Sequence, residues 1–451
     1  MSFFDNIVLP QSAEHIQLLH YLLILIQFLF LPFLGITLIG SILSLRYWKK
    51  GIKENNRNYL NFSKDVIDII TVNKSLGAAL GIFPIITSLL IYVQLLHKSN
   101  SPALIIMLIA LPLLIVGFIL VYVLKYSLSF TELFESLKDK STLNENLIYR
   151  IKKFENSSNR LARKSGIIAF ALLVVGSWYY ISAITSAIIT DFWVQSSYLG
   201  VLFSEYSILN FIQFILTASA ITGCVILFAF FYWEGGRVIP SDEYKNLVKN
   251  SSITIILTSL IILPLIILTN NLLLPKTILS GSIFAYSVIA IVLIFISYHL
   301  IYAITKTSNL KLSGQLFFVV IFMVLTLVIK DQMAMSNSTK AHSLILSEDF
   351  NKYLAELKGE NINAVKVRSG EEIFQVVCSA CHRFDEKLVG PPYNQVLTKY
   401  EGKMDELIGF ILNPVKVDPA YPPMPNQGLR RDEAKNIAEY LMQQHSKPTA
   451  K

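Results

Sequence analysis

Long apolar segments in the first three quarters of the chain constrain its fold more than any other feature. The hydrocarbon core of a bilayer, ~30 Å thick, needs roughly 20 consecutive apolar residues of helix. Runs near this length occur at residues 19–45, 76–97, 103–126, 166–190, 207–233, 252–270, 279–304 and 315–330. Backbone polar groups cannot be left unpaired in lipid, so such runs form helices. We therefore predict a bundle of about eight transmembrane helices.

The composition changes after the last apolar run. Over the whole chain, 53% of residues are hydrophobic and only 16% are charged, which is unusual for a soluble protein of 451 residues. Residues 331–451, in contrast, have the polarity of an ordinary globular sequence. The shift predicts a transmembrane domain over 1–332, a linker over 333–365 with one short helix near 347–358, and a small domain over 366–451.

Basic residues are distributed unevenly between the loops. Loop 46–75 carries seven Lys and Arg residues and loop 127–165 carries eight, whereas the opposite loops carry only Lys98 and Lys276. The positive-inside rule makes the basic loops cytoplasmic, so both termini face outward. The mixed charge of loop 127–165 also predicts that its flanking helices extend into water. The net charge of +8 is explained by these loops and does not indicate a nucleic-acid partner.

The polar C-terminal part contains the stretch VVCSACHRFDEKLVGPPY, residues 376–393. In a Cys-x-x-Cys-His motif, the two thiols attach haem covalently and the histidine binds its iron. This pattern is formed by Cys378, Cys381 and His382. Zinc is the alternative, but no second Cys/His pair follows to complete four ligands. The remaining cysteine, Cys224, lies in an apolar run and predicts no disulfide.

The sequence around this motif resembles class I cytochrome c over about residues 366–446. SGEEIFQVVCSACH is similar to the first helix of that family, and KLVGPPY to the loop that supports the histidine. The resemblance implies one covalent haem c with His382 and Met424, from PAYPPMPNQGL, as axial ligands. Pro391 would accept a hydrogen bond from the histidine ring through its carbonyl.

RDEAKNIAEYLMQQ predicts a final amphipathic helix. In the family this helix crosses the first one, which would place Tyr440 against Gly370 and Phe374. With both axial positions filled, the iron has no place for a substrate. The resemblance therefore implies an electron carrier, with no catalytic residue of its own.

Three apolar stretches resemble subunit I of cytochrome bd quinol oxidase: IQFLFLPFLGITL (26–38), NKSLGAALGIFP (73–84) and NFIQFILTASAITG (210–223). That family has haem-ligating histidines where this chain has Gln27 and, nearby, Gln213. Glutamine is a poor ligand of haem iron, and no acidic residue is expected in the middle of a span. We therefore expect a degenerate relative that does not reduce oxygen.

Histidines near the ends of the apolar runs keep a second interpretation open. His20 and His97 are the candidate ligands of a haem b, which we do not expect to be bound. The first interpretation is an all-α protein of the bacterial inner membrane with a periplasmic class I cytochrome c domain. It would be an electron-transfer subunit that works with respiratory membrane subunits and a periplasmic cytochrome or other redox protein. The alternative is a quinol:cytochrome c oxidoreductase with b haems and a quinone site.

Overall fold

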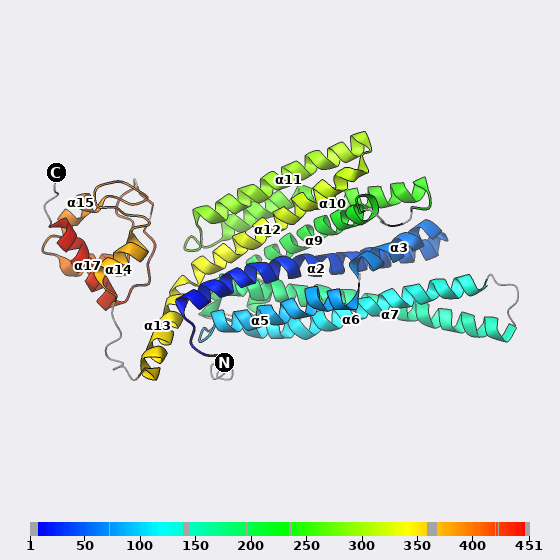
Figure 1. Cartoon of the computed structure of the whole chain (residues 1–451), viewed down its shortest axis with the longest axis horizontal. Coiled ribbons are helices and arrows are strands. Elements are labelled where there is room, and N and C mark those ends of the chain that lie inside the picture. The colour runs from blue at the N-terminus through cyan, green and yellow to red at the C-terminus, as the bar shows by residue number, and fades with distance from the viewer. Residues whose placement is uncertain are drawn as a thin grey trace. The chain divides into compact units, whose positions relative to one another are not determined.

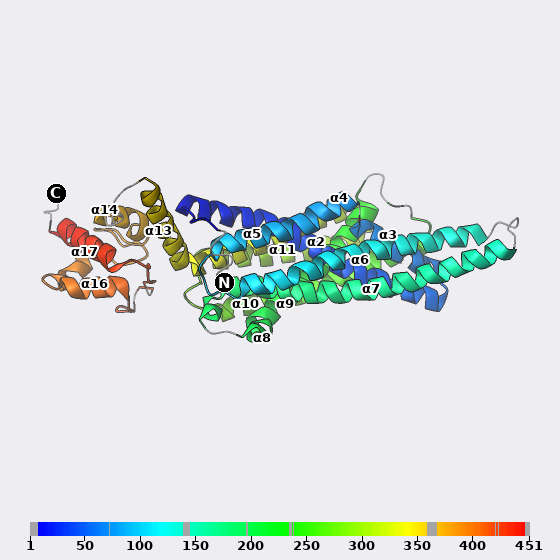
Figure 2. The same ribbon diagram turned by 90° about the horizontal axis from the view of Figure 1, so that it is seen from below.

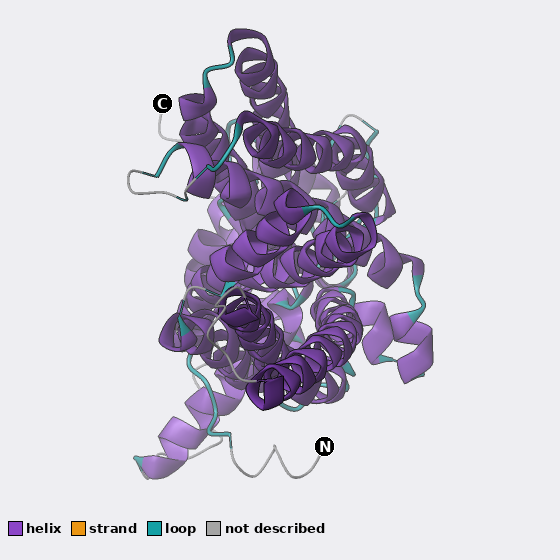
Figure 3. Ribbon diagram, turned by 90° about the vertical axis from the view of Figure 1, so that its right-hand side faces the viewer, coloured by secondary structure: helices purple, strands orange, loops and turns teal. Residues whose placement is uncertain are grey.

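The structure is a computed structural model. It describes residues 8–71, 73–138, 145–194, 197–233, 237, 239–358, 368–419, 421–422 and 424–446, with the backbone alone for 131–138 and 145. Helix is the only regular secondary structure in these residues, as Figure 3 shows. They form two compact units, one comprising Glu14–Thr339 and the other beginning at Lys340 and including Pro10–Ala13. The all-α prediction is confirmed.

Eight helical segments of the first unit are long and apolar enough to cross a membrane, as predicted. Figure 1 shows them running side by side. They are α2 (Ala13–Glu54), α4 (Lys74–Gly77) continued by the π-helical turn Ala78–Ile82 and α5 (Phe83–Leu95), α6 (Ala103–Lys138), α7 (Glu145–Ile188), α9 (Glu205–Phe231), α10 (Asp242–Leu273), α11 (Gly281–Thr307) and α12 (Ser313–Ser338). Shorter helices complete the unit: α3 (Arg57–Ile70), Thr190–Trp193, α8 (Tyr198–Leu202) and Leu310–Leu312.

The mixed-charge loop between the third and fourth spans forms helical extensions of α6 and α7, as predicted. Figure 2 shows the two helices paired along their length. Glycine allows their close approach, because a Cβ at Gly117 would lie 2.9 Å from Leu173 and one at Gly176 would lie 2.8 Å from Leu114. Small residues at such contacts are typical of helices that associate in lipid.

The predicted last span, 315–330, is too short. Helix α12 continues to Ser338 and therefore includes Lys330 and Asp331. Hydropathy alone ends the run at these charges, but the fold buries Lys330 to 2% exposure. The structure thus places an ion pair within helix α12, whereas the predicted span ended at Lys330 and excluded Asp331.

An ion-pair cluster fastens the amphipathic helix α3 to the bundle. Arg237 lies 2.7 Å from Asp65 and 3.7 Å from Asp68, and Lys125 of α6 lies 3.6 Å from Asp68. The Tyr244 hydroxyl of α10 donates a hydrogen bond to Asp65. These contacts join α3 to segments far away in the sequence.

The second unit is small and helical. It contains α13 (Lys340–Leu357), α14 (Gly370–Ile373) continued by the π-helical turn Phe374–Cys378, α15 (Tyr393–Val396) with the 3₁₀ turn Leu397–Tyr400, α16 (Met404–Leu412) and α17 (Arg431–His445). Its core includes Ile373, Leu407, Ile437 and Leu441, each 4% exposed or less. The helix expected near 347–358 is longer than predicted and belongs to this unit.

Helices α14 and α17 cross at Gly370. A Cβ there would lie 2.3 Å from the carbonyl oxygen of Asn436 and 2.4 Å from the Cβ of Tyr440, so only glycine fits this crossing. The rings of Phe374 and Tyr440 pack beside it with centroids 5.7 Å apart. The predicted contact between the first and last helices of this unit is therefore confirmed.

Candidate functional site

The two motif cysteines lie where the first helix of the small unit ends. A capping box formed by Ser369 and Glu372 starts this helix, and its π-helical turn ends at Cys378. The amides of Cys381 and His382 then both donate to the Cys378 carbonyl, at 3.1 and 3.0 Å. This turn places the three side chains of the motif on one short segment.

The His382 ring is held from three sides. Its Nδ1 lies 3.0 Å from the carbonyl oxygen of Pro391, and its ring stacks on Tyr393 with centroids 4.8 Å apart. A Cβ at Gly390 would lie 2.2 Å from Cε1 of the ring, so only a glycine at this position lets the loop pass so close to the ring. Because Nδ1 donates to a carbonyl, the ring is in the tautomer whose Nε2 can bind a metal.

His382, Cys378 and Met424 line the same cavity. Its volume is about 400 Å³, within the ~300–1,000 Å³ of typical ligand pockets. Most of the wall is apolar, including Leu397, Leu407, Phe410, Ile411, Val417 and Leu441. An imidazole, a thioether and a thiol around an apolar cavity are the groups that a His/Met-ligated haem c requires, so the residues fit that cofactor.

The loop that carries Met424 is fixed by its own polar side chains. Gln427 donates to the carbonyl of Pro425 at 3.0 Å, and Asn426 accepts from the Gly428 amide at 2.8 Å. Gly428 has a φ of +64°, a left-handed conformation that glycine adopts without strain. These contacts stabilise the segment that follows Met424.

Helix α13 supports this loop, although the sequence analysis regarded its segment as a linker. Arg430, directly after the loop, donates to Glu348 of α13 at 2.9 Å, and Lys340 donates to Gln427 at 3.4 Å. Glu348 and Arg430 are 82 residues apart, and no local sequence pattern pairs them. The opposite charges are the only sequence signal that could have suggested this contact.

A zinc site is less compatible with the geometry. Burial raises the pKa of the Cys378 thiol to about 11, and the Tyr393 hydroxyl only partly offsets this effect. In the part of the chain that the structure describes, no group of three or more His, Cys, Asp or Glu side chains could hold a metal ion.

A buried carboxylate joins the ends of α14 and α17. Glu433 is 5% exposed, and its Oε1 accepts from Nε of Arg368 at 2.6 Å. Burial alone would raise the pKa of Glu433, but the hydrogen bonds from Arg368 and the Arg430 amide, with both guanidinium charges, lower it overall. The carboxylate therefore stays ionised inside the unit.

The candidate haem b ligands contact different parts of the membrane unit. His20 of α2 is hydrogen-bonded to Gln332 of α12. His97 is buried in the turn after α5, where its amide donates to the Gln94 carbonyl at 3.4 Å. These contacts do not identify a haem b site.

The two glutamines at the positions of the expected histidines are buried and hydrogen-bonded. Gln27 donates to the Tyr92 hydroxyl at 2.9 Å, and Gln213 accepts from Asn270 at 2.8 Å. Both line a small cavity between the helices. Sequence reasoning missed Asn270, Lys330 and Asp331, which line a neighbouring cavity, because no local pattern brings these residues together and the predicted final span ended at Lys330.

Comparison with known proteins gives matches in the small unit. The family description "Cytochrome c" matches residues 367–445. Cytochrome c-551 of Pseudomonas denitrificans is 37% identical over 79 residues, which cover 16% of this chain and 95% of that protein. Cytochrome c-551 of Ectopseudomonas mendocina is 38% identical over 78 residues, and that of Azotobacter vinelandii is 35% identical over 78, each with the same coverage. The resemblance of the membrane helices to cytochrome bd has no support from these matches and stays a hypothesis.

The Glu433 interactions predict a pH-dependent contribution to stability. Because the folded pKa is lowered, the stabilisation is complete above the ordinary glutamate value of ~4.3 and is lost as pH falls through the folded value. Glu433→Gln should cost roughly 1.5–3 kcal/mol at neutral pH, and the difference from wild type should shrink in acid. Unfolding of the full chain in detergent, followed through near-ultraviolet circular dichroism at several pH values, measures this.

Glu439→Gln is the matched control, because its side chain is 54% exposed on the same helix. This variant should change stability by less than ~1 kcal/mol. A Glu433→Gln penalty that is absent at neutral pH, or that stays constant into acid, would contradict the assignment.

Proposed function

Because the chain belongs to the cytochrome c family through residues 367–445, we propose that it is a membrane-anchored electron-transfer subunit of a bacterial respiratory complex. Family membership means that the small unit carries covalently bound haem c and transfers electrons to and from redox proteins. The eight apolar helices are those of a multi-pass membrane protein. The observation that carries the proposal is the presence of both parts in one chain.

In this proposal each residue of the site has one role. Cys378 and Cys381 would hold the haem through thioether bonds, His382 and Met424 would bind its iron, and the Pro391 carbonyl orients the histidine ring. The bound haem supplies an iron that alternates between the ferric and ferrous states. With His382 and Met424 both bound, the protein leaves no coordination position for a substrate, which suits electron transfer.

The membrane unit, in the proposal, is a scaffold that binds neighbouring subunits and does not reduce oxygen. Gln27 and Gln213 support this role, because each is engaged by a neighbouring side chain and glutamine is a poor haem ligand. Only 28% of the most apolar 18-residue stretch of helix α11 is buried within the chain. The helix therefore keeps a broad apolar face for lipid or another subunit. One span would anchor a soluble domain, so eight suggest packing against partner subunits.

The alternative function, quinol oxidation with b haems and a quinone site, has weaker support. The cavity beside Gln27 and Gln213 has a volume of about 70 Å³, far below the ~300 Å³ lower limit of typical pockets for organic ligands. We therefore favour the electron-transfer subunit.

The haem content of the purified full chain tests the proposal. We expect one haem c and no haem b per chain in a pyridine haemochrome assay, and a c-type α band alone in the reduced spectrum. Stoichiometric haem b would contradict the scaffold role and would make His20 and His97 the leading ligand candidates.

The assignment of Met424 predicts a specific spectral change. Met424→Ala should abolish the weak sulfur-to-iron band near the red end of the visible spectrum and lower the reduction potential, because the thioether favours ferrous iron. Met442→Ala is the control, since this methionine packs against the same core but does not line the cavity. If the band survives in Met424→Ala, another residue is the ligand.

The proposed orientation places the cytochrome domain in the periplasm. In intact cells, a membrane-impermeant maleimide should label Thr277→Cys and leave Ser157→Cys unlabelled until the membrane is opened. Both positions are exposed, and they lie in segments expected on opposite sides, Thr277 in the turn before α11 and Ser157 in the extension of α7. The reverse labelling pattern would place the haem domain in the cytoplasm and refute the proposed orientation.

A further inference from the structure

An ion pair lies inside the membrane unit, on helix α12. Nζ of Lys330 is 3.0 Å from Oδ1 of Asp331. The Lys330 side chain is 3% exposed, whereas that of Asp331 is 33% exposed. Ionisable side chains within a membrane-spanning helix are costly and rare, so such residues usually have a function.

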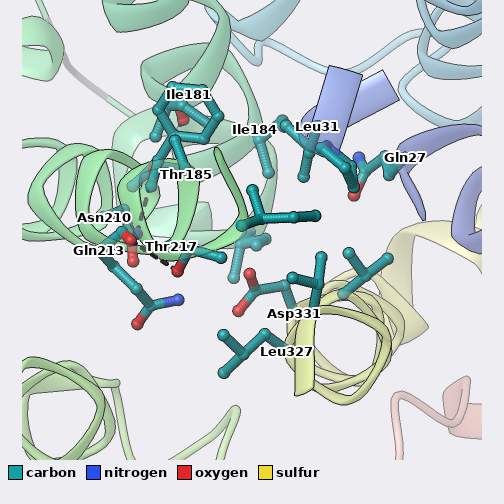
Figure 4. Close-up of a pocket in the computed structure, with 17 residues that line it drawn as sticks. Gln27, Leu31, Ile181, Ile184, Thr185, Asn210, Gln213, Thr217, Leu327 and Asp331 are labelled. Atoms are coloured by element: carbon teal, nitrogen blue, oxygen red, sulfur yellow. Dashed lines mark hydrogen bonds between the residues drawn. The ribbon is translucent and has the colours of Figure 1, made fainter. Parts of the chain in front are cut away.

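The Asp331 carboxylate borders a cavity whose wall is mostly apolar but carries several polar side chains. This cavity has a volume of about 70 Å³ and lies between α2, α7, α9 and α12. Figure 4 shows the carboxylate pointing from α12 toward the space that Gln27, Asn210, Gln213 and Thr217 also face. A second cavity of about 20 Å³ shares Asp331 and Asn210 with the first, and Lys330 lines it as well. Asp331 therefore borders both spaces.

Side-chain amides form a continuous polar wall beside these cavities. Asn210 donates to the Thr185 hydroxyl at 3.1 Å, and Asn270 donates to Oδ1 of Asn210 at 3.1 Å. Asn270 also donates to Oε1 of Gln213 at 2.8 Å. Five helices contribute to the polar lining, since Asn270 is on α10. Such hydrogen bonds hold membrane helices together, and the same groups can also bind a polar occupant of the cavities.

The size and chemistry of the larger cavity select water as that occupant. One water occupies ~30 Å³ of liquid and is stable where it finds two to four polar partners. A cavity of about 70 Å³ can hold a small cluster of waters but is too small for an organic redox carrier. A metal cation would compete with the Lys330 ammonium, which already neutralises Oδ1 of Asp331.

We propose that Asp331 is a proton-exchange site of the membrane unit, which takes up and releases protons through water held in this cavity. A hydronium of the cluster transfers its proton to the carboxylate, leaving a neutral carboxyl group and a water molecule, and the reverse step releases the proton. No carbon bond changes and nothing is oxidised. Lys330 provides the opposite charge that keeps the carboxylate ionised between these steps.

The contact of Asp331 with the cavity distinguishes this arrangement from a purely structural ion pair. The ion pair with Lys330 engages Oδ1 of Asp331. Asp331 also lines the cavity. A structural pair is stabilising only when protein groups satisfy its remaining lone pairs. The open side of Asp331 leaves that task to water, which can also deliver a proton.

Other titratable groups surround the cavity. Any test has to distinguish their signals from that of Asp331. Tyr92 of α5 bonds to Gln27, Tyr206 of α9 lines the second cavity, and His20 of α2 bonds to Gln332 next to Asp331. A tyrosine ordinarily titrates near 10 and a histidine near 6.5. An isotope label in aspartate identifies the carboxyl signal regardless of these neighbours.

Infrared difference spectra between acid and neutral pH test the proposal on the full chain in lipid nanodiscs. The wild type, with ¹³C in its aspartate carboxyl groups, should show a label-shifted C=O band at the high frequency of a buried carboxyl group. Asp331→Asn should remove this band. Asp191→Asn, which alters an exposed aspartate outside the spanning helices, should leave it unchanged.

Two further variants keep the test decisive. If Asp331→Asn does not fold, Asp331→Glu should keep a high-frequency carboxyl band that no longer shifts with the aspartate label. Lys330→Met should raise the proton affinity of Asp331 at least tenfold, because it removes the positive charge that favours the carboxylate. A folded Asp331→Asn protein with the wild-type band, or no such band in the wild type, would show that the pair is structural only.

Discussion

The absence of water from a bilayer interior is the constraint on which the membrane unit depends. Each backbone group there has to be paired within its own segment, so apolar runs become helices whatever their side chains. Helices in lipid gain little from hydrophobic burial against one another, because the surrounding lipid is equally apolar. Contacts of small residues, such as Gly117 and Gly176 between α6 and α7, therefore decide which helices lie together.

The same constraint makes the polar groups of the bundle informative. Gln27, Gln213, Asn210 and Asn270 are buried, or nearly so, and satisfied by neighbours on other helices. Lys330 and Asp331 form an ion pair that borders a cavity also lined by Asn210 and Asn270. Because polar groups in lipid are costly, this concentration at one place argues for a role beyond anchoring. The proposed proton exchange would give the membrane unit a chemical activity independent of the haem.

The small unit depends on a different constraint, the close crossing of α14 and α17 at Gly370. This crossing fixes the helix that ends in the two motif cysteines, and Gly390 then lets the supporting loop approach the His382 ring. Helix α13 adds a support that cytochrome motifs do not specify. Through Glu348 and Arg430 it is attached to the loop of Met424, so the segment that follows the last membrane helix helps to position the proposed axial ligand.

Sequence patterns were sufficient wherever the determining residues are close together in the chain. Eight apolar runs predicted eight membrane helices, since length and composition decide that outcome locally. The Cys378–His382 motif predicted haem c, and Gly370, Phe374 and Tyr440 predicted the helix crossing through their resemblance to a family. The bounds of α12 were wrong, because hydropathy ends the apolar run at Lys330, whereas the fold continues the helix to Ser338, pairs Lys330 with Asp331 and buries Lys330.

Contacts between distant segments were decided only by the tertiary structure. The pairing of Glu348 with Arg430, the amide wall of Asn210 and Asn270, and the cavity at Asp331 each require residues from separate helices to converge. A single sequence records which groups are present and not which ones meet. The sequence by itself thus determined the membrane helices and the haem-binding motif, because local hydropathy and spacing specify both. The support of the Met424 loop and the polar site at Asp331 came only from packing, because burial and hydrogen-bond partners are properties of the folded chain.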